Sequence, residues 1–183
     1  MERSAKPAKP ATPGYLERVA LRYLERYAGS VERVRRVLAR RVTRSVAELG
    51  TDPEEGVRAI DEVLAKLRRL GYLDDARFAG SRTRTLRKRG KSARAVRAAL
   101  SAQGIAAATI DAALAGEDVE VELDAARAFV KRRRLGPHRA SAEAREAERE
   151  KDLARLGRAG FSYAIALRAL SSSREDDGSS TGD

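Results

Sequence analysis

Hydrophobic residues recur every three or four positions along almost the whole chain, which places them on one face of an α-helix. The first stripe lies within residues 16–27, and a second follows Ser30, which can cap the N-terminus of a helix. A third helix is expected from Pro53, with Asp52 as its N-cap, to a stop at Gly71. The first stripe consists of Leu16, Val19, Ala20, Tyr23, Leu24 and Tyr27.

The same spacing predicts six more helices after Gly71. Because the helical period continues through nearly the whole chain, we expect an all-α protein. The markers of the six helices, in order, are a start at Asp74 or Asp75, a cap at Ser92, the pair Ile110 and Leu114, a stripe from Leu123 to Val130, a long helix over residues 141–158, and a cap at Ser162.

The helical pattern also repeats. The spacing Ser-x3-Val-x3-Leu occurs from Ser30 and again from Ser92, and the spacing Leu-x3-Gly occurs from Leu100 and again from Leu156. Such repeats predict units that contact mainly their neighbours, so we expect three tandem three-helix repeats in an elongated, curved array. The predicted parts are a disordered basic tail at 1–14, units at 15–73, 74–116 and 117–170, and a disordered acidic tail at 171–183.

The composition narrows the class of protein. The 183 residues include 38 Lys and Arg against 27 Asp and Glu, which gives a formal net charge of +11, and there is no cysteine. Disulfides and thiolate metal sites are therefore excluded. Residues 1–14 lack the apolar segment of a signal peptide, and no uncharged stretch approaches the length of a membrane span. We expect a cytoplasmic monomer that does not contact a membrane.

Groups suited to catalysis or to cofactor binding are scarce. His138 is the single histidine and follows a helix-stopping Pro137, so we interpret it as a solvated linker residue rather than a metal ligand or general base. The pair Asp74 and Asp75 has two interpretations, a metal site or helix capping, and its position at a helix start favours capping. We therefore expect no enzyme, no metal and no other cofactor.

Residues 76–110 contain nine Lys and Arg but no acidic residue. Such a patch attracts phosphates largely independently of sequence, although compositional bias on solvated helix faces is an alternative explanation. A second cluster, 131–134, lies in the last turn of its helix, where cations also favour the helix dipole. The candidate residues for binding nucleic acid or a protein filament on it are Arg77, Arg84, Arg87, Lys88, Lys91, Arg94, Arg97, Lys131, Arg132 and Arg134.

Aromatic residues make up only 4% of the chain and mostly occupy core stripes or helix ends. No platform for stacking of bases is expected from them, so contacts with nucleic acid should be made mainly to the backbone.

Several segments resemble the RecX family of bacterial recombination regulators. They include Gly-Tyr-Leu-Asp-Asp-Ala-Arg-Phe-Ala at 71–79, Arg-Gly-Lys-Ser at 89–92, and Arg-Ala-Gly-Phe-Ser at 158–162, which is similar to the family's C-terminal Arg-Gly-Phe-Ser signature. The opening residues 20–24 also fit the first unit of that family. The second helix departs from the family pattern, because Arg-Arg-Val at 40–42 stands where a terminal glycine is usual.

The resemblance implies an all-helical regulator that binds the RecA recombinase filament on single-stranded DNA. It further implies that binding blocks filament growth or favours disassembly, and so lowers strand exchange, ATP hydrolysis and the coprotease activity of the SOS response. Direct contact with the backbone of the single strand is also expected. Two alternatives stay open, a sequence-nonspecific DNA-binding protein with no preference for RecA and a helical scaffold for an acidic protein.

Overall fold

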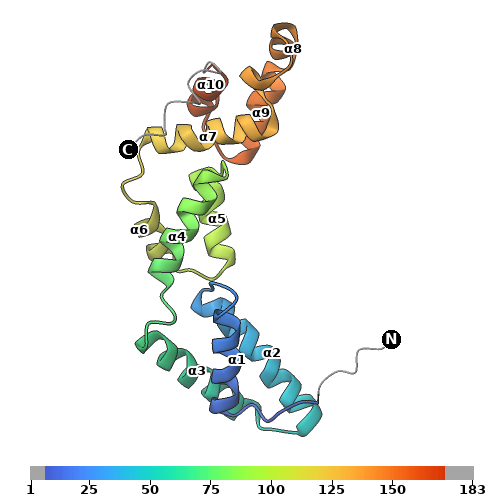
Figure 1. Ribbon diagram of the computed structural model, residues 1–183, viewed down its shortest axis with the longest axis vertical. Helices are drawn as coiled ribbons and strands as arrows, with labels where there is room; N and C mark the ends of the chain where they lie inside the picture. The colour runs from blue at the N-terminus through green and yellow to red at the C-terminus, as the bar shows by residue number, and fades with distance from the viewer. Residues whose placement is uncertain (1–6, 172–183) are drawn as a thin grey trace, which may run out of the picture. The chain divides into compact units, whose positions relative to one another are not determined.

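The computed structural model describes residues 7–171, and every regular element within them is a helix (Figure 1). The all-α prediction is confirmed. No helix in this part of the chain is both long enough and apolar enough to span a lipid bilayer. The helices are α1 (Pro13–Leu24), α2 (Val31–Leu49), α3 (Pro53–Arg69), α4 (Asp75–Lys88), α5 (Ala93–Ala102), α6 (Ala107–Leu114), α7 (Val119–Arg133), the 3-10 turn η1 (Gly136–His138), α8 (Ala142–Ala147), α9 (Arg149–Ala159) and α10 (Tyr163–Ser171).

The chain divides into two compact units. Unit 1 extends to Phe78 and also includes Gln103–Ile105, whereas unit 2 consists of Ala79–Ala102 and the residues from Ala106 onward. Helix α4 therefore begins in unit 1 and continues in unit 2. The division into three units that the sequence predicts stays a prediction.

In unit 1, α1, α2 and α3 pack against one another (Figure 1). Helices α2 and α3 approach closely at Gly56, where an added Cβ would lie 2.3 Å from Cγ1 of Val42. Tyr27 belongs to the predicted first stripe but lies beyond the end of α1, and its side chain is 58% exposed. The core of this unit consists of Leu16, Ala20, Val34, Leu38, Val42, Ala59, Ile60, Val63, Leu64, Leu67 and Leu73.

Two ends in unit 1 differ from the sequence-based expectation. Residues 7–14, predicted as part of a disordered tail, have defined contacts: the backbone N–H of Ala11 donates to Ser45 Oγ at 3.1 Å, and the Thr12 side chain caps α1. The rest of both predicted tails, 1–6 and 172–183, lies outside the described residues. Helix α2 continues past residues 40–42 and ends at Gly50, whose left-handed φ of 64° suits a glycine.

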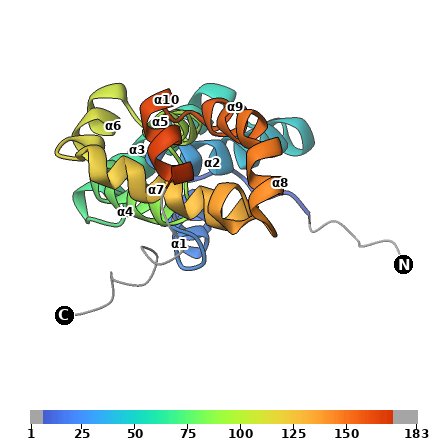
Figure 2. The ribbon, with the colours of Figure 1, turned by 90° about the horizontal axis from the view of Figure 1, so that it is seen from above.

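In unit 2, α10 packs against both α7 and α9 (Figures 1 and 2). Helix α5 packs against α6. The predicted long helix over 141–158 is two helices, α8 and α9, which meet at Glu148. Helix α8 buries no residue, so no packing requires it to continue the direction of α9. The core around α7, α9 and α10 consists of Leu123, Ala125, Ala126, Val130, Leu135, Leu156, Phe161, Ile165, Ala166, Ala169 and Leu170.

Both carboxylates of the Asp74–Asp75 pair accept hydrogen bonds at helix N-termini within unit 1. Asp74 Oδ1 accepts from the backbone N–H of Arg77 at 2.9 Å and so caps its own helix α4. Asp75 Oδ1 accepts from the backbone N–H of Val31 at 2.9 Å, at the start of α2. These bonds support the capping interpretation. They also show that the Asp75 carboxylate caps α2, a helix distant in sequence.

The two repeated serines make equivalent contacts, one in each unit. Ser30 Oγ accepts from the backbone N–H of Arg33 at 3.1 Å and donates to the carbonyl oxygen of Gln103 at 2.6 Å. That carbonyl precedes Gly104, which has a φ of 76°. One hydroxyl thus caps the start of α2 and also binds a carbonyl of the segment Gln103–Ile105 in the same unit.

In unit 2, Ser92 Oγ accepts from the backbone N–H of Ala95 at 3.2 Å and donates to the carbonyl oxygen of Ala159 at 2.7 Å. Ala159 again precedes a glycine, Gly160, with a φ of 100°. The Ser-x3-Val-x3-Leu and Leu-x3-Gly repeats in the sequence therefore correspond to a hydrogen-bonded contact that occurs in both units.

Replacing Ser92 by alanine is expected to lower the free energy of unfolding of unit 2 by about 1–2 kcal/mol. The Ser92 side chain is fully buried, and its removal leaves the backbone N–H of Ala95 and the carbonyl oxygen of Ala159 without this hydrogen-bond partner. Urea unfolding followed by circular dichroism measures the loss. Ser81→Ala is the control, since Ser81 is exposed on α4 and should change stability by less than about 0.5 kcal/mol. Equal midpoints for the two variants would contradict the role given to Ser92.

Candidate nucleic-acid interface

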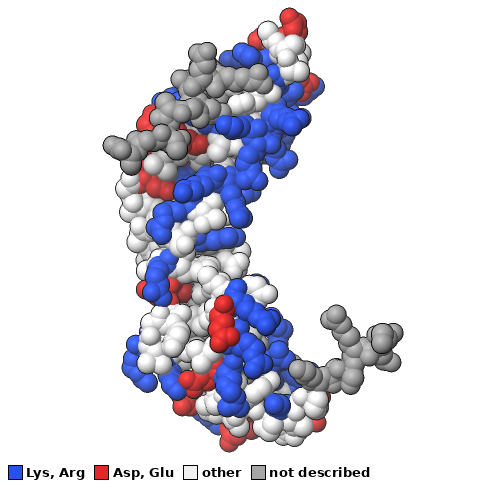
Figure 3. Space-filling view, viewed as in Figure 1, with Lys and Arg blue, Asp and Glu red and all other residues white. Residues whose placement is uncertain are grey.

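Helices α4 and α5 bury one face and turn most of their cations outward. Leu86, Val96 and Leu100 are buried, so residues on the opposite side of each helix point away from the interior. Lys and Arg side chains of unit 2 accordingly gather over α4, α5, α7 and α9 (Figure 3). Five exposed cations make up what we call the basic face of unit 2, namely Arg84, Lys88, Lys91, Arg94 and Arg97.

The members of the basic face differ in their partners. Arg97 pairs with Asp111 at 2.6 Å, and Arg94 Nη2 donates to the carbonyl oxygen of Gly157 at 3.3 Å. The other three, Arg84, Lys88 and Lys91, make no ion pair with any of the described residues. Their charges are thus available to an anionic partner.

Arg77 lies at the start of α4, in unit 1, and is exposed. Its Nη2 donates to the carbonyl oxygen of Gly71 at 2.8 Å, which ties the side chain to the turn that precedes the helix. The prediction that Arg77 binds a partner stays a prediction.

Arg87 does not point outward, in contrast to the expectation from the acid-free stretch. Its side chain is only 8% exposed and donates to Glu117, to Glu122 and, at 3.1 Å, to the carbonyl oxygen of Lys91. Burial lowers the pKa of the Arg87 guanidinium, but hydrogen bonds to Glu117 and Glu122 raise it further than burial lowers it. The side chain therefore stays charged and joins the end of α4 to the start of α7.

The second predicted cluster lies at the C-terminal end of α7. Lys131, Arg132 and Arg134 are all exposed, and Arg134 caps the helix in the left-handed conformation with a φ of 53°. Arg133 belongs to the same turn, and its guanidinium carbon lies 5.9 Å from the centroid of the Phe129 ring. The structure brings this turn close to α9, a helix that supplies further cations.

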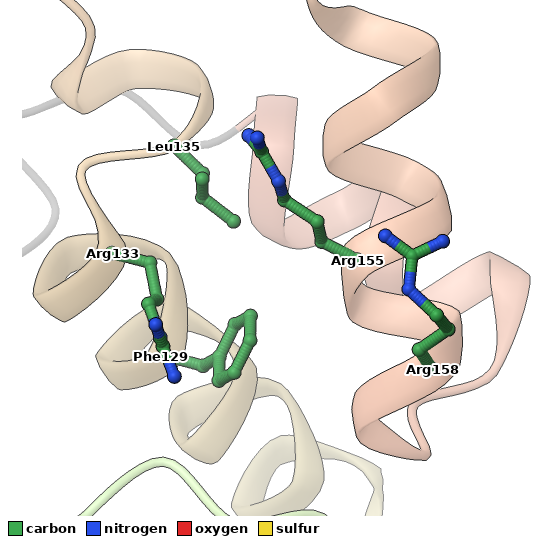
Figure 4. Close-up of a pocket in the computed structure, with 5 residues that line it drawn as sticks. All are labelled: Phe129, Arg133, Leu135, Arg155 and Arg158. Atoms are coloured by element: carbon green, nitrogen blue, oxygen red, sulfur yellow. The ribbon is translucent and has the colours of Figure 1, made fainter.

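A pocket of about 420 Å³ lies between the end of α7 and α9 (Figure 4). The sequence does not predict Arg155 and Arg158 of α9 as site residues, because Arg155 lies outside both basic clusters and Arg158 occurs only in the segment that resembles a family signature. Their spacing of three on one helix is the sequence signal that indicates a shared face. The lining residues are Phe129, Arg133, Leu135, Arg155 and Arg158.

The pocket adjoins the basic face within unit 2. Arg94 of α5 donates to the carbonyl oxygen of Gly157, the residue before Arg158, and an added Cβ on Gly160 would lie 2.9 Å from Arg94 Nε. Cations from α5 and α9 therefore lie on one continuous surface. Such a surface can bind successive phosphates of a nucleic-acid backbone.

Comparison with known sequences gives the family. Residues 74–114 match a family model described as "RecX, second three-helix domain". Regulatory protein RecX of Myxococcus xanthus (strain DK1622) is 40% identical over 172 residues, which cover 93% of this chain and 92% of that protein. Regulatory protein RecX of Streptomyces coelicolor is 32% identical and covers 77% of this chain and 74% of that protein.

Solved structures agree with the fold. A crystal structure of RecX from Lactobacillus salivarius superposes with a TM-score of 0.62 at 19% identity, over 86% of this chain and 94% of that one. A second crystal structure of a regulatory protein RecX gives a TM-score of 0.59 at 23% identity, over 87% of this chain and 72% of that one. Because the first sequence relative is 40% identical over nearly the full length of both proteins, the chain belongs to the RecX family of regulatory proteins.

Proposed function

We propose that this protein binds the RecA filament on single-stranded DNA through the basic face of unit 2 and inhibits recombinase, ATPase and coprotease activity. It would act in the cytoplasm, in DNA repair and the SOS response, as a regulator rather than an enzyme. Relatives named as regulatory proteins support the regulatory role. The RecA partner follows from the family resemblance of the sequence.

The observation that carries the choice of surface is the unbalanced charge of Arg84, Lys88 and Lys91. Some arginines of the described chain have carboxylate partners, such as Arg35 with Asp61 at 2.7 Å, whereas these three cations have none. A generic solvated surface would be expected to mix both signs of charge, whereas three neighbouring cations without carboxylates favour a polyanionic partner. Phosphates of the DNA strand, or acidic side chains of the filament, fit this chemistry.

The test combines the substitutions Arg84→Glu, Lys88→Glu and Lys91→Glu. We expect the concentration that half-inhibits the DNA-dependent ATPase of RecA to rise about tenfold or more, because three attractive contacts become repulsive. The control variant, Arg58→Glu with Arg68→Glu and Arg69→Glu, makes the same charge change on exposed positions of α3 in unit 1. Unchanged inhibition by the first variant, with an intact circular dichroism spectrum, would rule out this surface.

The two alternative functions give different results with the unmodified protein. A sequence-nonspecific DNA-binding protein would bind bare single strands as tightly as preformed RecA filaments, and a scaffold for an acidic protein would show no dependence on DNA. Salt dependence alone does not separate RecA binding from DNA binding, since both lose affinity as salt rises. Titration below and up to one molecule per RecA protomer then distinguishes blocking of growing ends from occupancy of the filament groove.

A further inference from the structure

The pocket between α7 and α9 combines three guanidinium groups with two apolar side chains. In Figure 4, Arg155 and Arg158 extend from α9, and Phe129 and Leu135 enter the same space from α7 and the segment that follows it. Its volume of about 420 Å³ is in the range of pockets that hold small ligands.

The positive charge of this pocket exceeds the negative charge near it. Asp152 Oδ1 accepts from Arg155 Nη1 at 2.9 Å, but the same carboxylate already binds Arg139 through two hydrogen bonds of 2.8 and 2.7 Å. Arg133 and Arg158 make no ion pair within the described residues. Glu148 lies 3.6 Å from Arg139 and adds a second carboxylate. The guanidinium groups of Arg133, Arg139, Arg155 and Arg158 still outnumber these two carboxylates, so an added anion would find unbalanced charge.

The apolar wall of the pocket is held in position. The Phe129 ring packs edge-on against Phe161, with 5.9 Å between the ring centroids, and Arg133 lies over it at 5.9 Å. The backbone of Phe129 is packed against Gly90, where an added Cβ would lie 2.6 Å from the Phe129 nitrogen. Aromatic rings and guanidinium planes are both surfaces on which nucleobases stack.

We propose that this pocket holds one nucleotide of a single strand, with its phosphate between Arg155 and Arg158 and its base against Phe129 and Arg133. The inference deepens the proposed function and rests on it: phosphates along the basic face would lead a strand past Arg94 to Arg158. It also assigns a stacking surface, which the sparse aromatic residues did not predict.

Direct binding of a single-stranded oligonucleotide that contains 2-aminopurine, measured without RecA, tests the pocket. Arg158→Gln should weaken binding about five- to tenfold and reduce the slope of log affinity against log salt by about 0.7, the value for one phosphate contact on a single strand. Phe129→Leu should leave that slope unchanged, yet weaken binding about fivefold or more and reduce the quenching of 2-aminopurine fluorescence. Arg145→Gln removes an equal charge from exposed α8 and should change neither quantity.

Three results would overturn the nucleotide site. They are equal affinity and slope for Arg158→Gln and Arg145→Gln, wild-type quenching in Phe129→Leu, and no binding of the oligonucleotide by the unmodified protein. Arg133 is exposed, so Arg133→Gln leaves the core intact, and its loss of 2-aminopurine quenching tests stacking if Phe129→Leu fails to fold. Inhibition of the RecA ATPase by the same variants is measured separately, so loss of the pocket and loss of the proposed function are distinguishable.

Discussion

Replacing Asp152 by alanine is expected to lower the free energy of unfolding of unit 2 by about 3–5 kcal/mol, the usual cost of removing one partner of a buried ion pair. The Asp152 side chain is fully buried. Its carboxylate accepts from the backbone N–H of Gly136 at 3.0 Å, from Arg155 at 2.9 Å and twice from Arg139. Alanine would leave the Gly136 N–H without an acceptor and the Arg139 guanidinium, 18% exposed, without its counter-charge.

The position of Asp152 explains why the loss should spread through the unit. Gly136 begins the η1 turn, and Leu170 of α10 packs against it so closely that an added Cβ would lie 2.7 Å from Leu170 Cδ2. The carboxylate thus connects α9 to the turn on which α10 packs. Its removal should therefore weaken the packing of α7, α9 and α10 against one another, and not only the contacts of a single side chain.

Urea unfolding followed by circular dichroism measures this effect, with Asp124→Ala as the control. Asp124 pairs with Arg127 at 3.2 Å, but its side chain is 71% exposed, so the loss should stay below about 1 kcal/mol. Asp152→Asn keeps the shape and removes the charge, and it should lie between the wild type and Asp152→Ala. Similar midpoints for Asp124→Ala and Asp152→Ala would contradict a structural role for the buried carboxylate.

The same carboxylate predicts an acid dependence of stability. Burial raises the pKa of Asp152, but the hydrogen bonds from Arg139, Gly136 and Arg155 lower the pKa by more than burial raises it. The pKa of Asp152 therefore lies below the usual value. A depressed folded-state pKa stabilises the protein above the unfolded-state pKa of about 3.9, and this stabilisation is lost as pH falls below it. Asp152→Ala should therefore flatten the decline of stability below about pH 4.

The structural features that the sequence predicted well depend on local interactions. The caps at Ser30, Asp52 and Ser92 each involve a side chain and a backbone N–H two or three residues later. Such contacts are set by the order of residues along one turn of helix, so a single sequence is enough to find them. The exposure of Arg84 and Lys88 follows for the same reason from the buried positions on their helix.

The features that the sequence did not predict depend on residues far apart in the chain. Arg87 lies in the same basic stretch as Arg84, but Glu117 and Glu122, about thirty residues later, draw its side chain inward. Asp75 binds the N-terminus of α2, 44 residues before it. The pocket forms only where α7 and α9 pack against each other. The helical period of the sequence does not predict these contacts, because they form only when the helices pack.

The contact between Gly90 and α7, which joins residues far apart in the sequence, predicts the second large loss of stability, in the variant Gly90→Ala. Gly90 has a φ of 73°, and an added Cβ would lie 2.6 Å from the nitrogen of Phe129, 2.8 Å from its Cα and 3.1 Å from the carbonyl oxygen of Ala125. All three are backbone atoms of α7, which cannot swing aside as a side chain can. Gly90→Ala should therefore cost about 2–5 kcal/mol, the sum of left-handed strain and overpacking.

Gly116→Ala separates these two contributions. Gly116 has a similar φ of 80° but nothing within 4 Å of an added Cβ. Gly116→Ala should therefore lower the free energy of unfolding only by the left-handed strain of about 1–2 kcal/mol. Equal losses of stability in the two variants would mean that the end of α4 does not touch α7. A larger loss at Gly90 would show that the end of α4 packs against the backbone of α7 at Phe129, so that stability and the proposed nucleotide site depend on the same glycine.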